Sequence, residues 1–307
     1  NDLTEVEQAG DRETTIFPYD LCTIFSFAES PIKRGVFWVG TDDGLVQVSQ
    51  DGGANWENVT PDDMPEWALV SKVEASRHDP ATAYVAVTRY KFGDYRPYLW
   101  KTEDYGRTWE KITSGISDID FTRVIKEDPG RRGLLYAGTE GGVYVSLDGG
   151  ASWQSLRLNM PPVPIHDLVV KDSDLVAGTY GRGFWILDDL TPLHQVTEQT
   201  AKTSAHLFKP RPAYRLLHEP LWRLNEKPAP GEKNYFIAVL GSPMTFDETV
   251  TPEGETVRNF LNAGTNPPEG VIVTYYLGQK PEGEVNLNIL DGKGQMIKSF
   301  SSRATQR

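Results

Sequence analysis

The sequence has 307 residues, of which 38% are hydrophobic and 24% are charged, and its formal net charge is −12. This composition is typical of a folded chain that is long enough to bury a core. The acidic excess argues against nucleic acid or an anionic membrane surface as a partner. No apolar stretch is long enough to form a transmembrane helix. The single cysteine, Cys22, excludes an internal disulfide and a cysteine-based zinc site.

The chain begins at Asn1 with a lead-in, residues 1–16, that has neither an initiating Met nor a signal-peptide pattern. We therefore expect a fragment or a processed product whose targeting sequence lies elsewhere. The absence of paired cysteines leaves the cellular compartment open.

From residue 17 to residue 195 the sequence is organised by a repeat. Its pattern, Ser/Thr-x-Asp-x-Gly-x-x-Trp, occurs three times, starting at Ser49, Thr102 and Ser146. A second pattern, an apolar run that usually closes on Gly-Thr, precedes each copy by half a period and returns in shorter form at residues 172–179. Two interleaved patterns with one period are much harder to obtain by chance than either alone, so the repeat indicates a repeated architecture.

Each repeat divides into short runs of apolar, β-branched or aromatic residues separated by Gly, Pro or Asp, and each run predicts a strand. The expected strands are residues 23–28, 36–40, 45–49 and 56–59, then 70–75, 83–88, 98–102 and 109–112, then 122–126, 134–138, 143–146 and 153–156, and finally 165–170, 175–178 and 184–187 without a clear fourth strand. No long helical period is present, so little helix is expected. Four strands in about 45–50 residues predict an all-β fold made of β-propeller blades.

The first pattern lies where a blade would turn from its third strand to its fourth. The aspartate can accept backbone N–H groups of the turn, the glycine can take a positive φ, and the tryptophan can wedge against the neighbouring sheet. A catalytic residue would be needed once, whereas a turn lock is needed in every repeat. We therefore interpret these residues as structural: Asp51, Gly53, Trp56, Asp104, Gly106, Trp109, Asp148, Gly150 and Trp153.

These segments resemble Asp-boxes, also called BNR repeats, which occur in sialidases, xyloglucan-cleaving propeller hydrolases, photosystem II assembly propellers and the luminal domain of sortilin. Residues 17–195 are most similar to bacterial exported proteins described as sortilin-like, VPS10-like or BNR-repeat glycosyl hydrolases. The strings that carry the resemblance are Val-Gly-Thr-Asp-Asp-Gly at 39–44, Ala-Gly-Thr-Glu-Gly-Gly at 137–142, Pro-Ile-His-Asp-Leu at 164–168, and Gly-Thr-Tyr-Gly-Arg-Gly-Phe-Trp-Ile-Leu-Asp-Asp at 178–189. The resemblance implies a propeller in a secreted, periplasmic or cell-surface protein. It leaves the activity open, because the repeat serves enzymes and receptors alike.

Relatives of this kind generally have more than four blades. We expect residues 17–195 to be four blades of a larger propeller, because an open arc leaves two sheet faces uncovered. The remaining blades would come from the rest of the protein or from another chain. Two segments follow the blades: a Pro-rich irregular linker at residues 196–265 and the start of an immunoglobulin-like β-sandwich at residues 266–307, with strands at 271–277, 284–290 and 295–300.

In a propeller, the turns between second and third strands open on the face opposite the repeated aspartate turns, together with the links between blades. The candidate ligand-binding residues on that face are Asp42, Asp43, Arg89, Tyr90, Glu140, His166, Tyr180 and Arg182, to which the blade links add Tyr19, Asp20, Trp67, Asp120 and Asp167. An insertion at residues 89–97 adds further aromatic residues to one of these turns. Acids, guanidinium groups and rings suit a sugar or a polar peptide, although a solvated rim of turn residues explains each of them as well. Since neighbours on a strand point to opposite faces, His166 is better explained as a structural histidine than as a base paired with Asp167.

Three classes of function stay open: a non-catalytic propeller that binds a polypeptide or a glycan, a glycoside hydrolase that acts on a polysaccharide, and an architectural module of a cell-surface assembly. A hydrolase needs two carboxylates about 5–10 Å apart, and no such pair stands out. The Arg-Ile-Pro motif of sialidases is absent, although Arg89, Arg123 and Arg182 offer three guanidinium groups. No phosphate loop or metal-ligand cluster indicates a cofactor or a metal. We therefore favour binding over catalysis and assign no catalytic residue.

Overall fold

The computed structural model describes residues 23–213, 246–251, 254, 256–260 and 270–303. The chain divides into two compact units, one that reaches to Lys209 and resumes at Tyr275, and one that spans Pro210–Thr274. The lead-in at residues 1–16 and the candidates Tyr19 and Asp20 lie outside the described residues. No helix in the described part of the chain is long and apolar enough to span a membrane.

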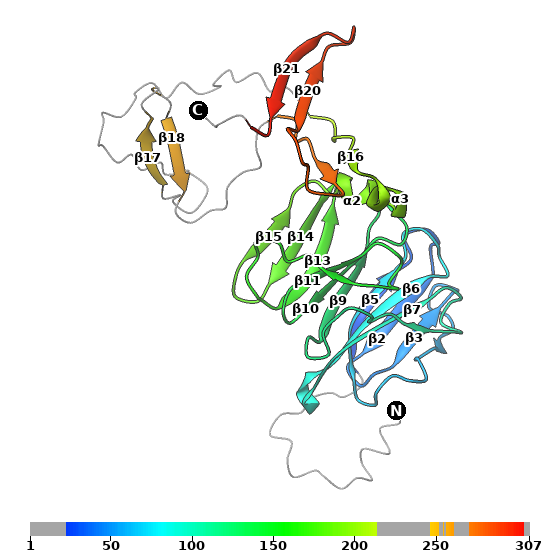
Figure 1. The fold of residues 1–307 in the computed structure, drawn as a ribbon. Coiled ribbons are helices and arrows are strands. Elements are labelled where there is room, and N and C mark those ends of the chain that lie inside the picture. The colour runs from blue at the N-terminus through cyan, green and yellow to red at the C-terminus, as the bar shows by residue number, and fades with distance from the viewer. Residues whose placement is uncertain (1–22, 214–245, 252–253, 255, 261–269, 304–307) are drawn as a thin grey trace, which may run out of the picture. The chain divides into compact units, whose positions relative to one another are not determined.

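Three antiparallel sheets of four strands and one of three strands follow one another in the first unit (Figure 1). The first sheet holds β1 (Ile24–Glu29), β2 (Phe37–Thr41), β3 (Val46–Ser49) and β4 (Glu57–Asn58). The second holds β5 (Leu69–Ala75), β6 (Ala83–Arg89), β7 (Asp94–Thr102) and β8 (Glu110–Lys111). The third holds β9 (Thr122–Glu127), β10 (Leu135–Thr139), β11 (Val143–Ser146) and β12 (Gln154–Ser155), and the fourth holds β13 (Ile165–Lys171), β14 (Asp174–Thr179) and β15 (Phe184–Leu187).

The strands of each sheet are ordered as they are in the chain, and the first strands of successive sheets, β1, β5, β9 and β13, lie against one another. This is the arrangement of β-propeller blades. The all-β class and the four-stranded unit predicted from the repeat are therefore confirmed. Among the described residues the fourth blade has three strands, at the point where no last strand could be recognised in the sequence.

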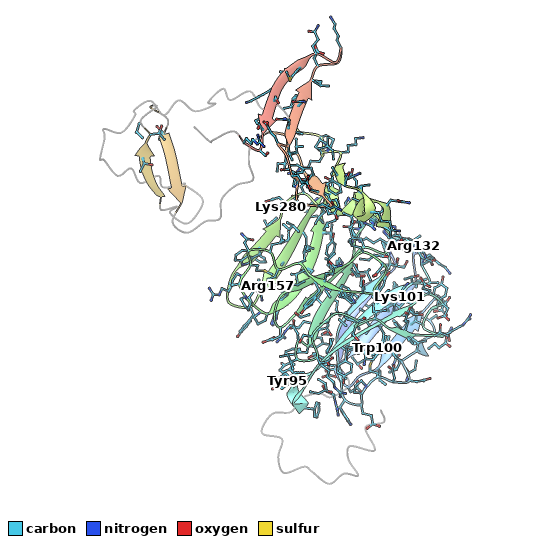
Figure 2. The ribbon with its side chains drawn as sticks, in the orientation of Figure 1. Tyr95, Trp100, Lys101, Arg132, Arg157 and Lys280 are labelled. Atoms are coloured by element: carbon cyan, nitrogen blue, oxygen red, sulfur yellow. The ribbon has the colours of Figure 1, made fainter. Side chains whose placement is uncertain are left out.

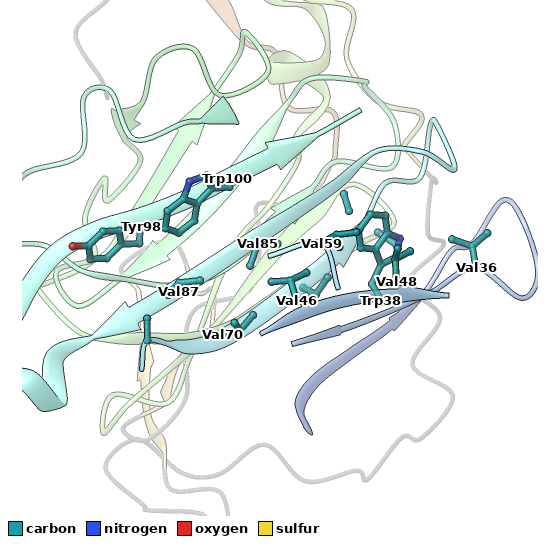
Figure 3. Packing of buried hydrophobic residues seen from close by; sticks show 14 residues of the cluster. Val36, Trp38, Val46, Val48, Val59, Val70, Val85, Val87, Tyr98 and Trp100 are labelled. Carbon is teal, nitrogen blue, oxygen red and sulfur yellow. The ribbon is translucent and has the colours of Figure 1, made fainter. Parts of the chain in front are cut away.

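Apolar side chains that interleave between neighbouring sheets hold the blades together (Figure 3). Trp38 and Val46 of the first blade pack with Val70 and Trp100 of the second, and all four side chains are fully buried. β6 is buried along nearly its whole length because its two faces contribute to two different cores. Burial of one such side chain stabilises the fold by about 1.5–3 kcal/mol.

One buried carboxylate links the second blade to the third. Glu127 is 1% exposed and accepts hydrogen bonds from the Ser76 hydroxyl at 2.5 Å, the Tyr84 hydroxyl at 3.0 Å and the Arg77 N–H at 3.0 Å. Three donors offset the cost of burying this group. Burial, and then the charge of Glu127, raise the pKa of Tyr84, so the phenol keeps the proton that it donates.

Beyond the blades the first unit has two short helices, α2 (Thr191–Gln195) and α3 (Glu198–Lys202), and β16 (Ala205–Leu207), which pairs with β19 (Tyr275–Leu277). β20 (Asn286–Leu290) forms a hairpin with β21 (Met296–Ser301). In the other unit, β17 (Phe246–Val250) pairs with β18 (Thr256–Phe260). β20 lies within the strand expected at residues 284–290, and β21 overlaps the strand expected at residues 295–300. The sandwich itself stays a prediction.

The segment 196–265 differs from the irregular linker expected there, because it contains α3, β16, β17 and β18. The five residues between β17 and β18 include a proline and a glycine, which is typical of a hairpin loop. The prolines elsewhere in the segment obscured that pattern in the sequence. The domain boundaries at residues 17, 196 and 266 stay predictions.

Candidate ligand-binding face

The three turns that carry the repeat, residues 49–56, 102–109 and 146–153, are called the repeat turns below. In each of them the aspartate Oδ1 of Asp51, Asp104 or Asp148 accepts the backbone N–H four residues on, at 2.9 Å. A Ser or Thr hydroxyl two residues before the aspartate donates to the same carboxylate and accepts the N–H of the turn glycine. Hydrogen bonds, that from the Asn55 side chain first, lower the pKa of Asp51 from 3.8 to about 2. These carboxylates are therefore committed to holding their own turns.

The repeat turns of the second and third blades also connect their blade to the preceding one. Trp109 Nε1 donates to the carbonyl of Val59 at 2.6 Å, and Trp153 Nε1 donates to the carbonyl of Ile112 at 2.7 Å. Gly150, at a φ of +100°, lies so close to Ile112 that an added β-carbon would come within 2.8 Å of its side chain. The repeat turns thus perform a mechanical task.

That other end is built from turns that differ in every blade: β2–β3, β6–β7, β10–β11 and β14–β15, called the variable face below. The β6–β7 turn contains a 3₁₀ turn, η1 (Tyr90–Phe92), that the corresponding turns of the other blades lack. Figure 2 shows Tyr95, which follows η1, and Lys101, which precedes a repeat turn, toward the two ends of β7. The variable face and the repeat turns therefore lie at opposite ends of the blades.

A hollow of about 410 Å³ opens on the variable face where the first and second blades meet. It is called the Arg89 pocket and is lined by Asp42, Trp67, Leu69, Thr88, Arg89, Tyr90, Lys91 and Phe92. The structure thus brings together three of the predicted binding residues, from the turns of two different blades, with the tryptophan of the link between those blades. Cationic groups and aromatic rings dominate the lining, which suits a ligand that offers both oxygen acceptors and a flat or apolar surface.

Arg89 is the residue that sets this pocket apart. Its Nε is buried and has no hydrogen-bond partner among the described residues, and the same holds for Thr88 Oγ1. The guanidinium lies over Phe92, with its Cζ 5.2 Å from the ring centre, a contact that orients the group without satisfying its N–H groups. A buried donor left unpaired costs about 1–3 kcal/mol, so Arg89 is held in this position at a cost to stability.

The pocket wall also contains an uncommon backbone conformation. Trp67 has a φ of 58°, in the left-handed region that a bulky side chain seldom adopts. Backbone strain of this kind costs of order 1–3 kcal/mol and is often found at ligand sites. At Trp67, this backbone conformation places the indole ring at the pocket wall.

A second group of side chains surrounds Arg123, beside the pocket. Arg123 donates to Glu140 Oε2 from Nη2 at 2.6 Å and from Nε at 3.0 Å. Its Cζ lies 4.8 Å from the ring centre of Phe121 and 5.4 Å from that of Tyr90, and those two rings stack at 5.1 Å. Because Tyr90 also lines the Arg89 pocket, the two groups form one continuous surface.

His166 and Asp167 do not form an acid–base pair. His166 stacks on Tyr180 with ring centres 5.2 Å apart, while Asp167 forms an ion pair with Lys72 at 3.1 Å. Burial, and then the positive charge of Arg123, lower the pKa of His166, which keeps its ring neutral near pH 7. Both residues therefore belong to the surface of the variable face, with separate partners.

The carboxylates of the variable face are engaged in structural contacts. Asp42 accepts the Thr23 N–H at 2.8 Å, and Asp43, which is 3% exposed, accepts the Thr41 hydroxyl. Asp120 accepts a backbone N–H and a tyrosine hydroxyl of the third blade. These acids shape the turns rather than project from them.

The remaining predicted residues are distributed unevenly. Tyr180 is 72% exposed and stacks on His166, and it is not among the residues that line the Arg89 pocket. Arg182 is exposed, and within the described part of the chain only its carbonyl is bonded, to the Trp185 indole. Two lining residues of the pocket, Thr88 and Lys91, were not among the binding residues predicted from the sequence. Thr88 looks like any other strand residue until its burial is known.

No family model and no curated protein sequence matches the chain. Solved β-propeller structures do resemble it. YCF48 bound to a D1 peptide is 21% identical with a TM-score of 0.42, and the match covers 54% of this chain and 51% of that one. The GH74 xyloglucanase from Xanthomonas campestris is 16% identical with a TM-score of 0.40, covering 53% and 29%. The extracellular domain of BT4673 from B. thetaiotaomicron is 17% identical with a TM-score of 0.41, covering 55% and 22%.

The match thus spans about half of the YCF48 chain and less of the two larger ones. At these identities the likeness concerns the fold alone. The sheets and turns described above define β1–β15 as β-propeller blades, and the nature of any ligand has to be argued from the residues of this chain.

Proposed function

We propose that this chain is part of a non-catalytic β-propeller that binds a polypeptide or a glycan in the Arg89 pocket. The observation that carries the proposal is the hollow of about 410 Å³, whose wall combines the cationic side chains of Arg89 and Lys91 with three aromatic side chains. The resemblance of the repeat turns to Asp-boxes, and of residues 17–195 to sortilin-like exported proteins, adds a secreted, periplasmic or cell-surface location to the proposal.

The lining limits the chemistry of the ligand. A guanidinium presents a fixed fork of donors that matches a carboxylate or two neighbouring oxygens, and Lys91 adds a second cation to the same hollow. Trp67, Tyr90 and Phe92 supply flat apolar surface against which a peptide side chain or a sugar ring can stack. The group that enters is therefore small, rich in oxygen acceptors and flat on one side.

Hydrolysis of a glycan on this face is less well supported. It requires one carboxylic acid that gives a proton to the leaving group and a second carboxylate that attacks or activates water. Asp42 and Asp43 instead accept hydrogen bonds from Thr23 and Thr41, and Glu140 is paired with Arg123. Binding requires no such free carboxylate, so the geometry of the variable face favours it.

The test is a binding screen of the full chain on peptide and glycan arrays, followed by affinity measurements for the strongest ligand. Arg89→Ala should lower the affinity for that ligand by roughly tenfold or more, because charge-assisted hydrogen bonds are lost. Arg182→Ala, on the same face but outside the pocket, should have a smaller effect. Gln50→Ala, in a repeat turn, is the control, and loss of binding in this variant with normal binding by Arg89→Ala would refute the proposal.

A further inference from the structure

The fourth blade differs from the other three in the strand that closes its sheet. In the first three blades a short polar outer strand covers the third strand: Glu57–Asn58, Glu110–Lys111 or Gln154–Ser155. In the fourth blade β15 is the outermost strand among the described residues (Figure 1). Its sequence, Phe-Trp-Ile-Leu, is entirely apolar, and Phe184 and Ile186 are 81% and 58% exposed. Open sheet edges are normally protected by charged residues or Pro, and β15 has neither.

The backbone of β15 presents hydrogen-bonding groups on this edge. The last residue of β14 donates its N–H to the Gly183 carbonyl, so Gly183 faces β14. Because residues that face a given partner strand alternate along a strand, the backbone groups of Phe184 and Ile186 point away from β14. Val143 takes the place of Phe184 in the third blade, and its carbonyl accepts the Leu156 N–H of the outer segment at 2.8 Å. The edge of β15 is therefore oriented to pair with a further strand.

A narrow, mostly apolar hollow lies beside this edge, between the third and fourth blades. Its volume is about 60 Å³, and it is lined on one side by Leu156 and Met160 and on the other by Ala177, Trp185 and Ile186. Met160 and Ala177 are buried and belong to the core shared by the two blades. The hollow thus opens directly onto apolar core, next to backbone groups that can pair with a strand.

The interfaces between the other blades show what fills the corresponding position. Leu156 directly follows β12, as Val59 follows β4 and Ile112 follows β8. The carbonyls of Val59 and Ile112 accept the indole N–H of Trp109 and Trp153, which come from the repeat turn of the next blade. The fourth blade has no repeat turn, and within the described part of the chain the Leu156 carbonyl accepts no hydrogen bond. The position that a tryptophan occupies twice is thus open beside Leu156.

We propose that the fourth blade binds an extended peptide of another protein, which supplies the outer strand. The peptide carries Trp, two polar residues and an apolar residue in this order, as residues 109–112 and 153–156 do. Its indole enters the hollow and donates to the Leu156 carbonyl, while the polar residues pair with β15. Backbone pairing supplies affinity, and the ring in the hollow supplies selectivity. The site shares no lining residue with the Arg89 pocket, and it does not depend on the function proposed above.

The test uses the full chain and a fluorescein-labelled peptide with the sequence of residues 146–156, and it follows binding by fluorescence anisotropy. We expect saturable binding, and Trp153→Ala in the peptide should lower the affinity roughly tenfold or more, because ring burial and a hydrogen bond are lost. Ile186→Pro in the protein removes an N–H that points away from β14 and should also lower the affinity roughly tenfold. Ile186→Ala keeps this N–H and is the matched control, whose affinity should stay within about threefold of the parent value.

Lack of saturable binding, or equal binding of the two peptides, would overturn the proposal. Hydrogen exchange of the full chain distinguishes other occupants, because the amides of Phe184 and Ile186 should exchange readily without the peptide and slowly with it. Slow exchange without the peptide would contradict the proposal. A second copy then occupies the edge if the rate depends on protein concentration, and a segment of the same chain if it does not. This readout uses the parent protein, so it decides the question even if Ile186→Pro fails to fold.

Discussion

The repeat turns and the variable face lie at opposite ends of the same blades, yet they treat their polar groups in opposite ways. In the repeat turns each aspartate is bonded within its own turn, and Trp109 and Trp153 reach the neighbouring blade. On the variable face, Asp43 Oδ2, Thr88 Oγ1 and Arg89 Nε are buried without a partner among the described residues. The aspartates that recur in the repeat turns are thus bonded within their own turns, whereas the variable face contains buried polar atoms without a partner among the described residues.

The two ends also affect stability in opposite directions. A hydrogen bond in a repeat turn contributes about 0.5–1.5 kcal/mol, whereas a buried donor without a partner lowers stability. Well-secured turns at one end therefore allow the blades to keep groups at the other end that suit binding rather than stability.

The strongest test of this comparison uses a glycine from each end. Gly150→Ala places a side chain on a backbone with a φ of +100° and brings its β-carbon within 2.8 Å of Ile112. We expect the free energy of unfolding, measured by denaturant titration, to fall by about 2–4 kcal/mol. Gly181→Ala on the variable face has a φ of +87° but nothing within 4 Å, so a loss of about 1 kcal/mol is expected. Equal losses would show that contact between blades is not the reason for a glycine in the repeat turn.

A smaller effect is expected from the turn carboxylate. Asp104→Ala removes hydrogen bonds from Thr108 N at 2.9 Å and Thr108 Oγ1 at 2.7 Å, and should lower the free energy of unfolding by about 1–2 kcal/mol. Ligand affinity should stay unchanged, because the turn faces away from the Arg89 pocket. Asp118→Ala, an exposed acid in a link between blades, serves as the control. A loss of binding in Asp104→Ala without a loss of stability would contradict the division of tasks.

The stability of the protein should also depend on pH, because the hydrogen bonds of the repeat turns require ionised aspartates. Since hydrogen bonds lower the pKa of Asp51 from 3.8 to about 2, its contribution is complete above pH 3.8 and is lost as the pH falls toward 2. Between pH 3.8 and pH 2, we expect the melting temperature of the parent protein to fall further than that of the Asp51→Asn variant. Parallel melting curves for the two proteins would mean that the carboxylate does not hold the turn.

The smallest effect on stability is expected at Arg89 itself. Arg89→Met removes a donor that has no partner among the described residues, so the free energy of unfolding should change by less than about 0.5 kcal/mol or should rise. Arg123→Met is the matched variant on the same face. It breaks the pair with Glu140, which is partly exposed, and should cost about 0.5–1 kcal/mol. A large loss of stability in Arg89→Met would show that Arg89 serves the fold rather than a ligand.

Much of the fold was predictable because its repeat is short and strongly punctuated. The Gly, Pro and Asp residues between apolar runs defined the strands of the first three blades to within a few residues. The hairpin β17–β18 was missed, because its two short strands do not alternate between apolar and polar residues and prolines surround them. Helices α2 and α3 were also unexpected, since segments this short have no recognisable period.

The site was predictable only in part. Asp42, Arg89 and Tyr90 could be selected because turn positions in a blade are set by the repeat. The pairing of Arg123 with Glu140 depends on the register between β9 and β10, where Thr122 lies opposite Thr139 after a bulge, and such a bulge leaves little trace in a sequence. The role of Thr88 depends on burial between blades, which no local pattern reports.

The most direct test of the central claim is a titration of the labelled full chain with the strongest array ligand, observed through side-chain N–H signals. The account predicts that the Arg89 Nε–H and Trp67 indole signals shift with ligand concentration, while the indole signals of Trp109 and Trp153 stay in place. Shifts of Trp109 and Trp153 with constant Arg89 and Trp67 signals would contradict it, because the ligand would then bind at the repeat turns.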